Sequence, residues 1–177
     1  TQTAFIKAFN TEPEGEGEAP DDEDSTDEGA DTGETDEVLL DTAGDLFGYS
    51  LALSGDGRTL AVGARQEDSN ATNIDGDADN NSSPNSGAVY VFALDDAQGW
   101  QRQAFVKPSN TRQNSVFGTS LALSKDGNTM AVGAPGESVD SRGVNASQNP
   151  DRRTLPGTGA VYAFTRTDDQ WAQGAYI

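Results

Sequence analysis

Short hydrophobic stretches separated by polar turns run through most of this chain. Between residues 47 and 107 they predict four strands, at 47–54, 59–65, 87–94 and 100–107. The third stretch, which contains Val89 and Phe92, is apolar on both faces, as expected for a strand in the middle of stacked sheets. Gly55-Asp56-Gly57 predicts a tight turn between the first two strands, because Gly and Asp tolerate positive φ. No stretch has a helical period, so the pattern predicts an all-β unit of four short antiparallel strands.

The same pattern occurs a second time further along the chain. Phe47-Gly48 recurs as Phe117-Gly118, and Trp100 recurs as Trp171. Repetition at a spacing of 70 or 71 residues indicates an array of similar units, each too small to bury its own core. Four strands per repeat predict the blades of a β-propeller, whereas a sandwich would not repeat its sequence in this way. We therefore expect about two blades here, completed by further blades or by other subunits.

The repeat divides the chain into segments. Residues 1–10 predict a strand of a neighbouring or swapped blade, because Gln2–Lys7 resembles Gln103–Lys107. The first blade is expected at 45–107 and the second at 115–177, with its last strand truncated. Two interpretations follow: the chain is a piece of a longer propeller, or identical chains complete one another by strand addition into a closed ring or a filament.

Residues 12–41 have a different composition from the rest of the chain. They contain fifteen Asp and Glu residues and no Lys or Arg. Such a segment cannot bury a core and predicts a solvated acidic insertion between two strands of the repeat. The alternative is a segment held in place by cations or by a neighbouring subunit. Since the second unit has no such insertion, deletion of residues 12–41 should leave the blades folded.

Composition narrows the classes of function. Thirty acidic residues against 11 basic ones give a net charge of −19, which disfavours nucleic acid and anionic membranes and favours cations or basic partners. The chain has no Cys and no His, so disulfides, thiol chemistry and histidine acid–base catalysis are excluded. No apolar run is long enough to span a membrane. The sequence singles out no pair of carboxylates for hydrolysis, so we expect a protein that is not an enzyme.

Two short motifs carry a resemblance to a known family. Phe47-Gly48 with Gly63-Ala64-Arg65, and Phe117-Gly118 with Gly133-Ala134-Pro135, resemble the FG-GAP repeats of integrin α-subunit propellers and their bacterial relatives. The resemblance implies a non-enzymatic structural or adhesion module, extracellular or at the cell surface, with copies of itself, neighbouring blades, or a protein or glycan ligand as partners. The alternatives are a carbohydrate-binding propeller and a propeller fragment of a larger secreted protein.

The two tryptophans bear on the carbohydrate-binding alternative. Trp100 and Trp171 could stack on sugars, but aromatic residues at repeat spacing favour packing within the blades.

The resemblance also implies calcium in the hairpins between the first two strands of a blade. Here each hairpin keeps a single carboxylate, Asp56 or Asp126, which cannot supply the six to eight oxygens that calcium prefers, so these predict plain turns. Alternating carboxylates at Asp75, Asp77 and Asp79 are a better calcium candidate. The alternative for that stretch is an Asx-rich surface loop.

Four sequons for N-glycosylation lie in the long polar loops. They begin at Asn70, Asn80, Asn81 and Asn145. Chance occurrence in Asn- and Ser-rich loops explains them, and any that carry glycan should be exposed.

Overall fold

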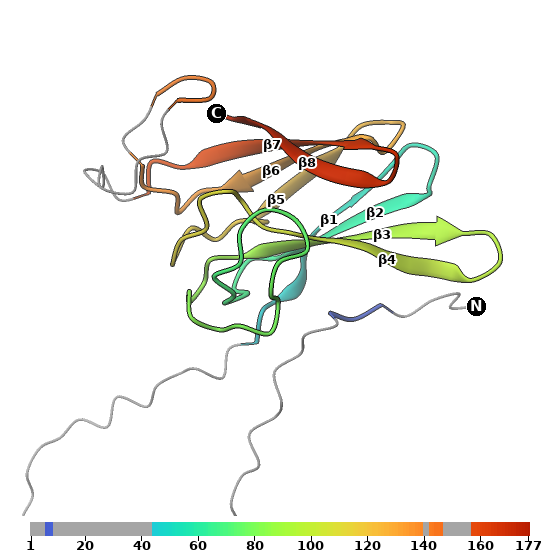
Figure 1. Cartoon of the computed structure of the whole chain (residues 1–177), viewed down its shortest axis with the longest axis horizontal. Coiled ribbons are helices and arrows are strands. Elements are labelled where there is room, and N and C mark those ends of the chain that lie inside the picture. The colour runs from blue at the N-terminus through green and yellow to red at the C-terminus, as the bar shows by residue number, and fades with distance from the viewer. Residues whose placement is uncertain (1–5, 9–43, 140–141, 147–156) are drawn as a thin grey trace, which may run out of the picture.

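The computed structural model describes residues 6–8, 44–139, 142–146 and 157–177, which form two four-stranded antiparallel sheets (Figure 1). In each sheet the strands follow one another in chain order, as in a propeller blade. The first sheet contains β1 (Phe47–Leu53), β2 (Thr59–Ala64), β3 (Ala88–Asp95) and β4 (Gly99–Val106). The second contains β5 (Ser120–Leu123), β6 (Thr129–Ala134), β7 (Ala160–Thr167) and β8 (Gln170–Tyr176). The prediction of an all-β protein with two four-stranded blades is confirmed, and the bounds of the first four strands agree within one residue.

The hairpin between β1 and β2 is held by its own polar side chains. Gly57 adopts a φ of +73°, which the turn requires. The Asp56 carboxylate accepts hydrogen bonds from the Ser54 hydroxyl (2.6 Å) and the Arg58 amide (3.0 Å), and these bonds lower the pKa of Asp56. The hairpin of the second sheet repeats this arrangement around Asp126. Each carboxylate is thus engaged inside its turn, as expected for a plain turn.

The two sheets pack face to face, with β5 lying against β1 (Figure 1). Alternation along the strands gives each sheet one face toward the other. We call the residues between them the inner cluster. It comprises Ala61, Val89, Val91, Ala104, Val106, Phe117, Met130, Val132, Ala134, Tyr162, Phe164, Trp171 and Tyr176. Each sheet buries this face only against its neighbour, as the repeat pattern predicts.

The opposite face of the first sheet carries a second set of buried residues, the outer cluster. It comprises Val62, Ala64, Ala71, Ala78, Ala88, Tyr90, Phe92 and Phe105. Ile6 and Ala8 pack against this cluster, although residues 6–8 do not form a strand. The rest of the strand expected at 1–10, and the whole acidic insertion at 12–41, lie outside the described residues.

The last strand of the second blade is longer than the sequence suggested. β8 has seven residues against eight in β4, and it pairs with β7 from Gln170 to Tyr176. Asp168 and Asp169, both at positive φ, form the tight turn before the strand. The pairing is irregular at Gly174, as it is at Gln103 in β4. The strand that was expected to be truncated is thus shorter than β4 by one residue, because residues 170–177 are the repeat equivalents of residues 99–106.

Candidate interaction surface

The contact between the sheets depends on glycines in the repeated motifs. The Ser50 hydroxyl on β1 donates a hydrogen bond of 2.6 Å to the Gly118 carbonyl oxygen. Gly63 on β2 lies beside it, and a Cβ atom at Gly63 would overlap that same oxygen. A Cβ atom at Gly87 would overlap the backbone of Phe117. The Phe-Gly pair of the second unit thus fits against glycines of the first, which leave room for its backbone.

The second sheet has an uncovered face at the positions that the first sheet buries. Val89 and Val106 of the inner cluster are fully buried, whereas their repeat equivalents Val161 and Ile177 are 41% and 54% exposed. Val161 and Ile177 are joined by paired backbone hydrogen bonds of 2.9 and 3.0 Å. This surface is an apolar sheet face with no covering layer among the described residues.

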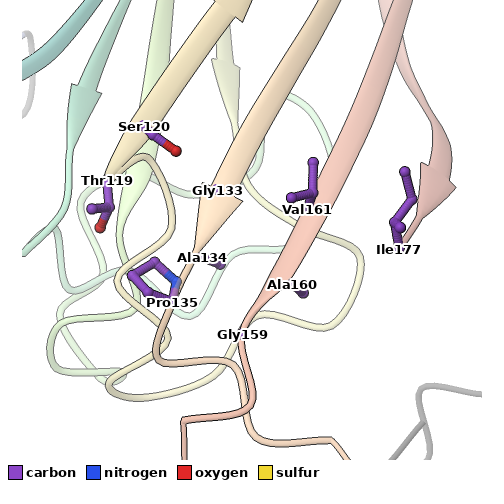
Figure 2. Close-up of a pocket in the computed structure, with 9 residues that line it drawn as sticks. All are labelled: Thr119, Ser120, Gly133, Ala134, Pro135, Gly159, Ala160, Val161 and Ile177. Atoms are coloured by element: carbon purple, nitrogen blue, oxygen red, sulfur yellow. The ribbon is translucent and has the colours of Figure 1, made fainter. Parts of the chain in front are cut away.

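A shallow hollow of about 400 Å³ lies on this face (Figure 2). It is lined by Thr119, Ser120, Gly133, Ala134, Pro135, Gly159, Ala160, Val161 and Ile177. Ser120 is the repeat equivalent of Ser50, which donates to the Gly118 carbonyl oxygen, and Gly133 is the equivalent of Gly63, which leaves room for that oxygen. We call this surface the open face. It presents the same groups that hold one sheet against the next.

A buried ion pair fixes the loop between β2 and β3. The Lys107 ammonium lies 2.5 Å from the Glu67 carboxylate and donates a second hydrogen bond of 2.7 Å to Ser86 Oγ. The side chains are 0% and 1% exposed. Burial raises the pKa of Glu67 and lowers the pKa of Lys107, because desolvation disfavours each charge. The other Glu67 oxygen accepts the Ser69 amide, so the pair ties the loop to the end of β4.

Glu137 occupies the equivalent position in the second unit with different partners. One of its oxygens accepts the amides of Ser138 and Val139. The other accepts the Asn110 side-chain amide (3.2 Å) and shares the proton of the Tyr162 hydroxyl (3.1 Å) with the Asn110 side-chain oxygen (2.8 Å). Burial, followed by the nearby Glu137 charge, raises the pKa of Tyr162. Within the described part of the chain no ion pair involves Glu137.

Sequence reasoning missed both buried glutamates. A signal was present, because Glu67 and Glu137 follow the two Gly-Ala motifs at the same distance. Only the contacts of Glu67 and Glu137 in the structure show that these side chains hold the loops in place.

Comparison with known families agrees with the geometry of the sheets. A model of the FG-GAP repeat matches residues 41–92, which contain β1, β2 and most of β3. This chain carries an FG-GAP repeat. The matched stretch includes Gly63 and Gly87, so the FG-GAP repeat contains the glycines that contact the next unit. The second sheet repeats the strand order and pairing of the first and forms a second blade.

No curated protein matches the chain. The described residues include no helix that is long and apolar enough to cross a membrane.

The predicted calcium ligands lie on the exposed part of the FG-GAP repeat's long loop. Asp75, Asp77 and Asp79 are all exposed. The Asp75 amide donates a hydrogen bond to the Phe105 carbonyl oxygen, and the Asp75 carboxylate accepts one from the Phe105 amide, both at 2.8 Å. Asp77 accepts the Asp79 amide. Within the described ranges no three acidic, His or Cys side chains gather closely enough to hold a metal ion. Calcium at this loop therefore stays a prediction.

The second unit shows what Asp75 does in the loop. Asn145 stands at the equivalent position and makes the same pair of bonds with Tyr176, at 2.7 and 2.9 Å. Both residues adopt a φ of +53°, a conformation that Asn and Asp tolerate best. A neutral amide serves as well as a carboxylate here, so the shared role is to fasten the loop to the fourth strand.

The tryptophans serve packing. Trp171 is 5% exposed, belongs to the inner cluster, and donates a 2.9 Å hydrogen bond to the Gln103 side-chain oxygen. Trp100 packs against the outer cluster. The packing interpretation is confirmed.

The sequons differ in exposure. Asn70, Asn81 and Asn145 are exposed, whereas Asn80 is half-buried.

Proposed function

We propose that this chain is a non-enzymatic structural module of the propeller type that acts by stacking its sheets on further blades. The observation that carries the proposal is the contrast between the two units. Val161 and Ile177 on the open face are exposed at positions where Val89 and Val106 are fully buried. A contiguous apolar sheet face rimmed by polar loops is typical of an interaction site.

The other end of the stack supports the same function. On β1, Leu51 and Leu53 are 64% and 57% exposed. Their equivalents Leu121 and Leu123 pack against the inner cluster. The exposed residues at each end of the stack therefore have equivalents in the other unit that are covered by a neighbouring sheet. A module with these two ends adds to a row of blades.

We further propose that the module belongs to an extracellular or cell-surface protein with an adhesive or structural role. The FG-GAP repeat supports this location, and the net charge of −19 favours basic or cationic partners. An epitope tag inserted in the exposed β3–β4 turn, at Ala97, should be accessible to antibody on intact cells. Labelling only after the cells are permeabilised would contradict the proposed location.

The stacking can be tested by extending the chain in register. Ile177 is the repeat equivalent of Val106, so residues 107–177 joined directly after Ile177 continue the chain as it continues after Val106. We expect the added unit to cover the open face. Amide exchange at β6 and β7 should slow, and the melting temperature should rise.

Gly133→Ala in the extended chain is the matched control. At Gly63, which is already covered, a Cβ atom overlaps the Gly118 oxygen of the neighbouring unit. At Gly133 the nearest atom to such a Cβ is only the Ser120 hydroxyl, which can rotate. The substitution should therefore cancel the protection while leaving the host blades folded. If the added unit gives no protection at all, the face does not take a blade.

A further inference from the structure

The outer side of the first sheet repeats the surface that the second sheet uses to pack on it. In the second unit, Phe117 packs edge-on against Tyr162 and Phe164, with ring centroids 5.4 and 6.0 Å apart. In the first unit, Phe47 meets Tyr90 and Phe92 edge-on at 5.2 and 6.3 Å. The same aromatic arrangement is thus present twice, once inside the stack and once at its end.

The open face supplies the other half of this contact. It carries Ser120 and Gly133 where the first sheet uses Ser50 and Gly63 to bind the second. One chain therefore displays both complementary halves of the contact between its sheets, at opposite ends. Such surfaces join identical molecules head to tail.

We infer that the open face binds the outer side of the first sheet of a second copy of this chain, reproducing between copies the contact that joins the two sheets within one. This rests on the proposed function and names the partner. The Ser120 hydroxyl donates to the Gly48 carbonyl of the second copy, as Ser50 donates to Gly118. Leu51 and Leu53 of the second copy become covered, as Leu121 and Leu123 are within the chain.

The assembly has a predictable size. Each copy contributes two blades, and propellers close with about four to eight blades. Two to four copies would therefore complete a ring, if the rotation between sheets closes; otherwise the same contact continues as a filament.

The segment at residues 6–8 lies on the surface that the second copy needs. Ile6 follows Ala-Phe and precedes Lys, as Val106 does in β4, and it packs on the outer cluster as Val106 packs on the inner one. In the docked pair Ile177 takes this place. Removal of residues 1–8 should therefore strengthen association, because the segment no longer has to be displaced. Weaker association after removal would contradict this placement.

Light scattering over a concentration series tests the inference. The mass of the unmodified chain should rise with concentration, to a plateau of about two to four monomers if a ring closes and without a plateau if a filament forms. Gly133→Ala, which blocks the open face, and Leu51→Asp, which places a charge on the opposite surface, should each remain monomeric. Ala97→Asp adds the same charge in an exposed turn and should associate as the unmodified chain does.

Mixing the two blocked variants is the decisive arm. Each retains one intact surface, so an equimolar mixture should form dimers and nothing larger. A monomeric unmodified chain at all concentrations, or association that Gly133→Ala leaves unchanged, overturns the inference. Melting temperatures that match the unmodified chain at a concentration where it is monomeric establish that Gly133→Ala and Leu51→Asp are folded.

The two proposals fail differently. If the chain stays monomeric but the in-register extension protects the open face, the face takes a blade and the second copy is the wrong partner. If the extension gives no protection, the proposed stacking itself is wrong.

Discussion

Replacing Lys107 with Met should strongly destabilise the first blade. The Lys107 ammonium and the Glu67 carboxylate are almost completely buried, 2.5 Å apart. Met fills a similar volume, but it leaves Glu67 as a buried charge with no counter-ion. Breaking a buried pair in this way costs about 3–5 kcal/mol, a large part of the roughly 5–15 kcal/mol by which a domain is stable.

The double variant Lys107→Met/Glu67→Gln separates the cost of the orphaned charge from the value of the pair. Gln keeps an oxygen for the Ser69 amide and removes the charge. Because the pair itself loses hydration on burial, the double variant should recover most of the stability that the single variant loses. Urea unfolding, followed by tryptophan fluorescence, measures all three free energies of unfolding.

The loss of stability caused by Lys107→Met should depend on pH. Burial raises the pKa of Glu67, and removal of the Lys107 charge raises this pKa further. A carboxyl group whose pKa is raised by folding contributes stability that is fully present below its unfolded pKa, about 4.3, and is lost as pH rises through the folded pKa. The deficit of Lys107→Met relative to the unmodified chain should thus be largest near neutral pH and shrink on acidification. A deficit below about 1 kcal/mol that is constant with pH would refute the reasoning, since a surface pair behaves in that way.

Three further outcomes are expected. Phe117→Ala should cost about 3–5 kcal/mol in urea unfolding, whereas Phe47→Ala should cost less, because Phe47 is only half-buried; equal costs would show that the first sheet is covered in solution. Deletion of residues 12–41 should leave the circular dichroism spectrum of the blades intact, and loss of that spectrum would make the segment structural. Calcium bound at the long loop should raise the melting temperature in a way that Asp77→Asn abolishes, and an unchanged melting temperature removes calcium from the loop.

The strands could be predicted because their signals are local. Val89 to Phe92 form a continuous apolar run, and the turns at Gly57 and Gly127 use residues that accept positive φ. The repeat then fixed the number of sheets, since both copies of a motif must adopt the same local structure. Burial of Trp171 followed from its repeat position for the same reason.

Contacts between distant polar side chains could not be predicted in this way. Glu67 and Lys107 are forty positions apart, and although Glu67 recurs as Glu137 after the second Gly-Ala motif, nothing in the sequence pairs Glu67 with Lys107. Asp75 resembled a metal ligand because carboxylates alternate around it, yet its carboxylate fastens the loop to Phe105. In each case the two partners are distant in sequence, and the tertiary structure determines which groups come into contact.

The two buried glutamates show which part of this polar network belongs to a blade and which part joins blades. Glu67 and Glu137 each use one oxygen to fix the start of the long loop in their own unit. The second oxygen of Glu67 binds Lys107 at the end of the same unit's fourth strand. The second oxygen of Glu137 instead binds Asn110, which lies in the segment between the units, and Asn110 also accepts the Tyr162 hydroxyl. The aromatic core of the second blade is therefore hydrogen-bonded to the chain leaving the first, so packing and polar contacts couple the same two neighbours, and the stability of either blade depends on the other.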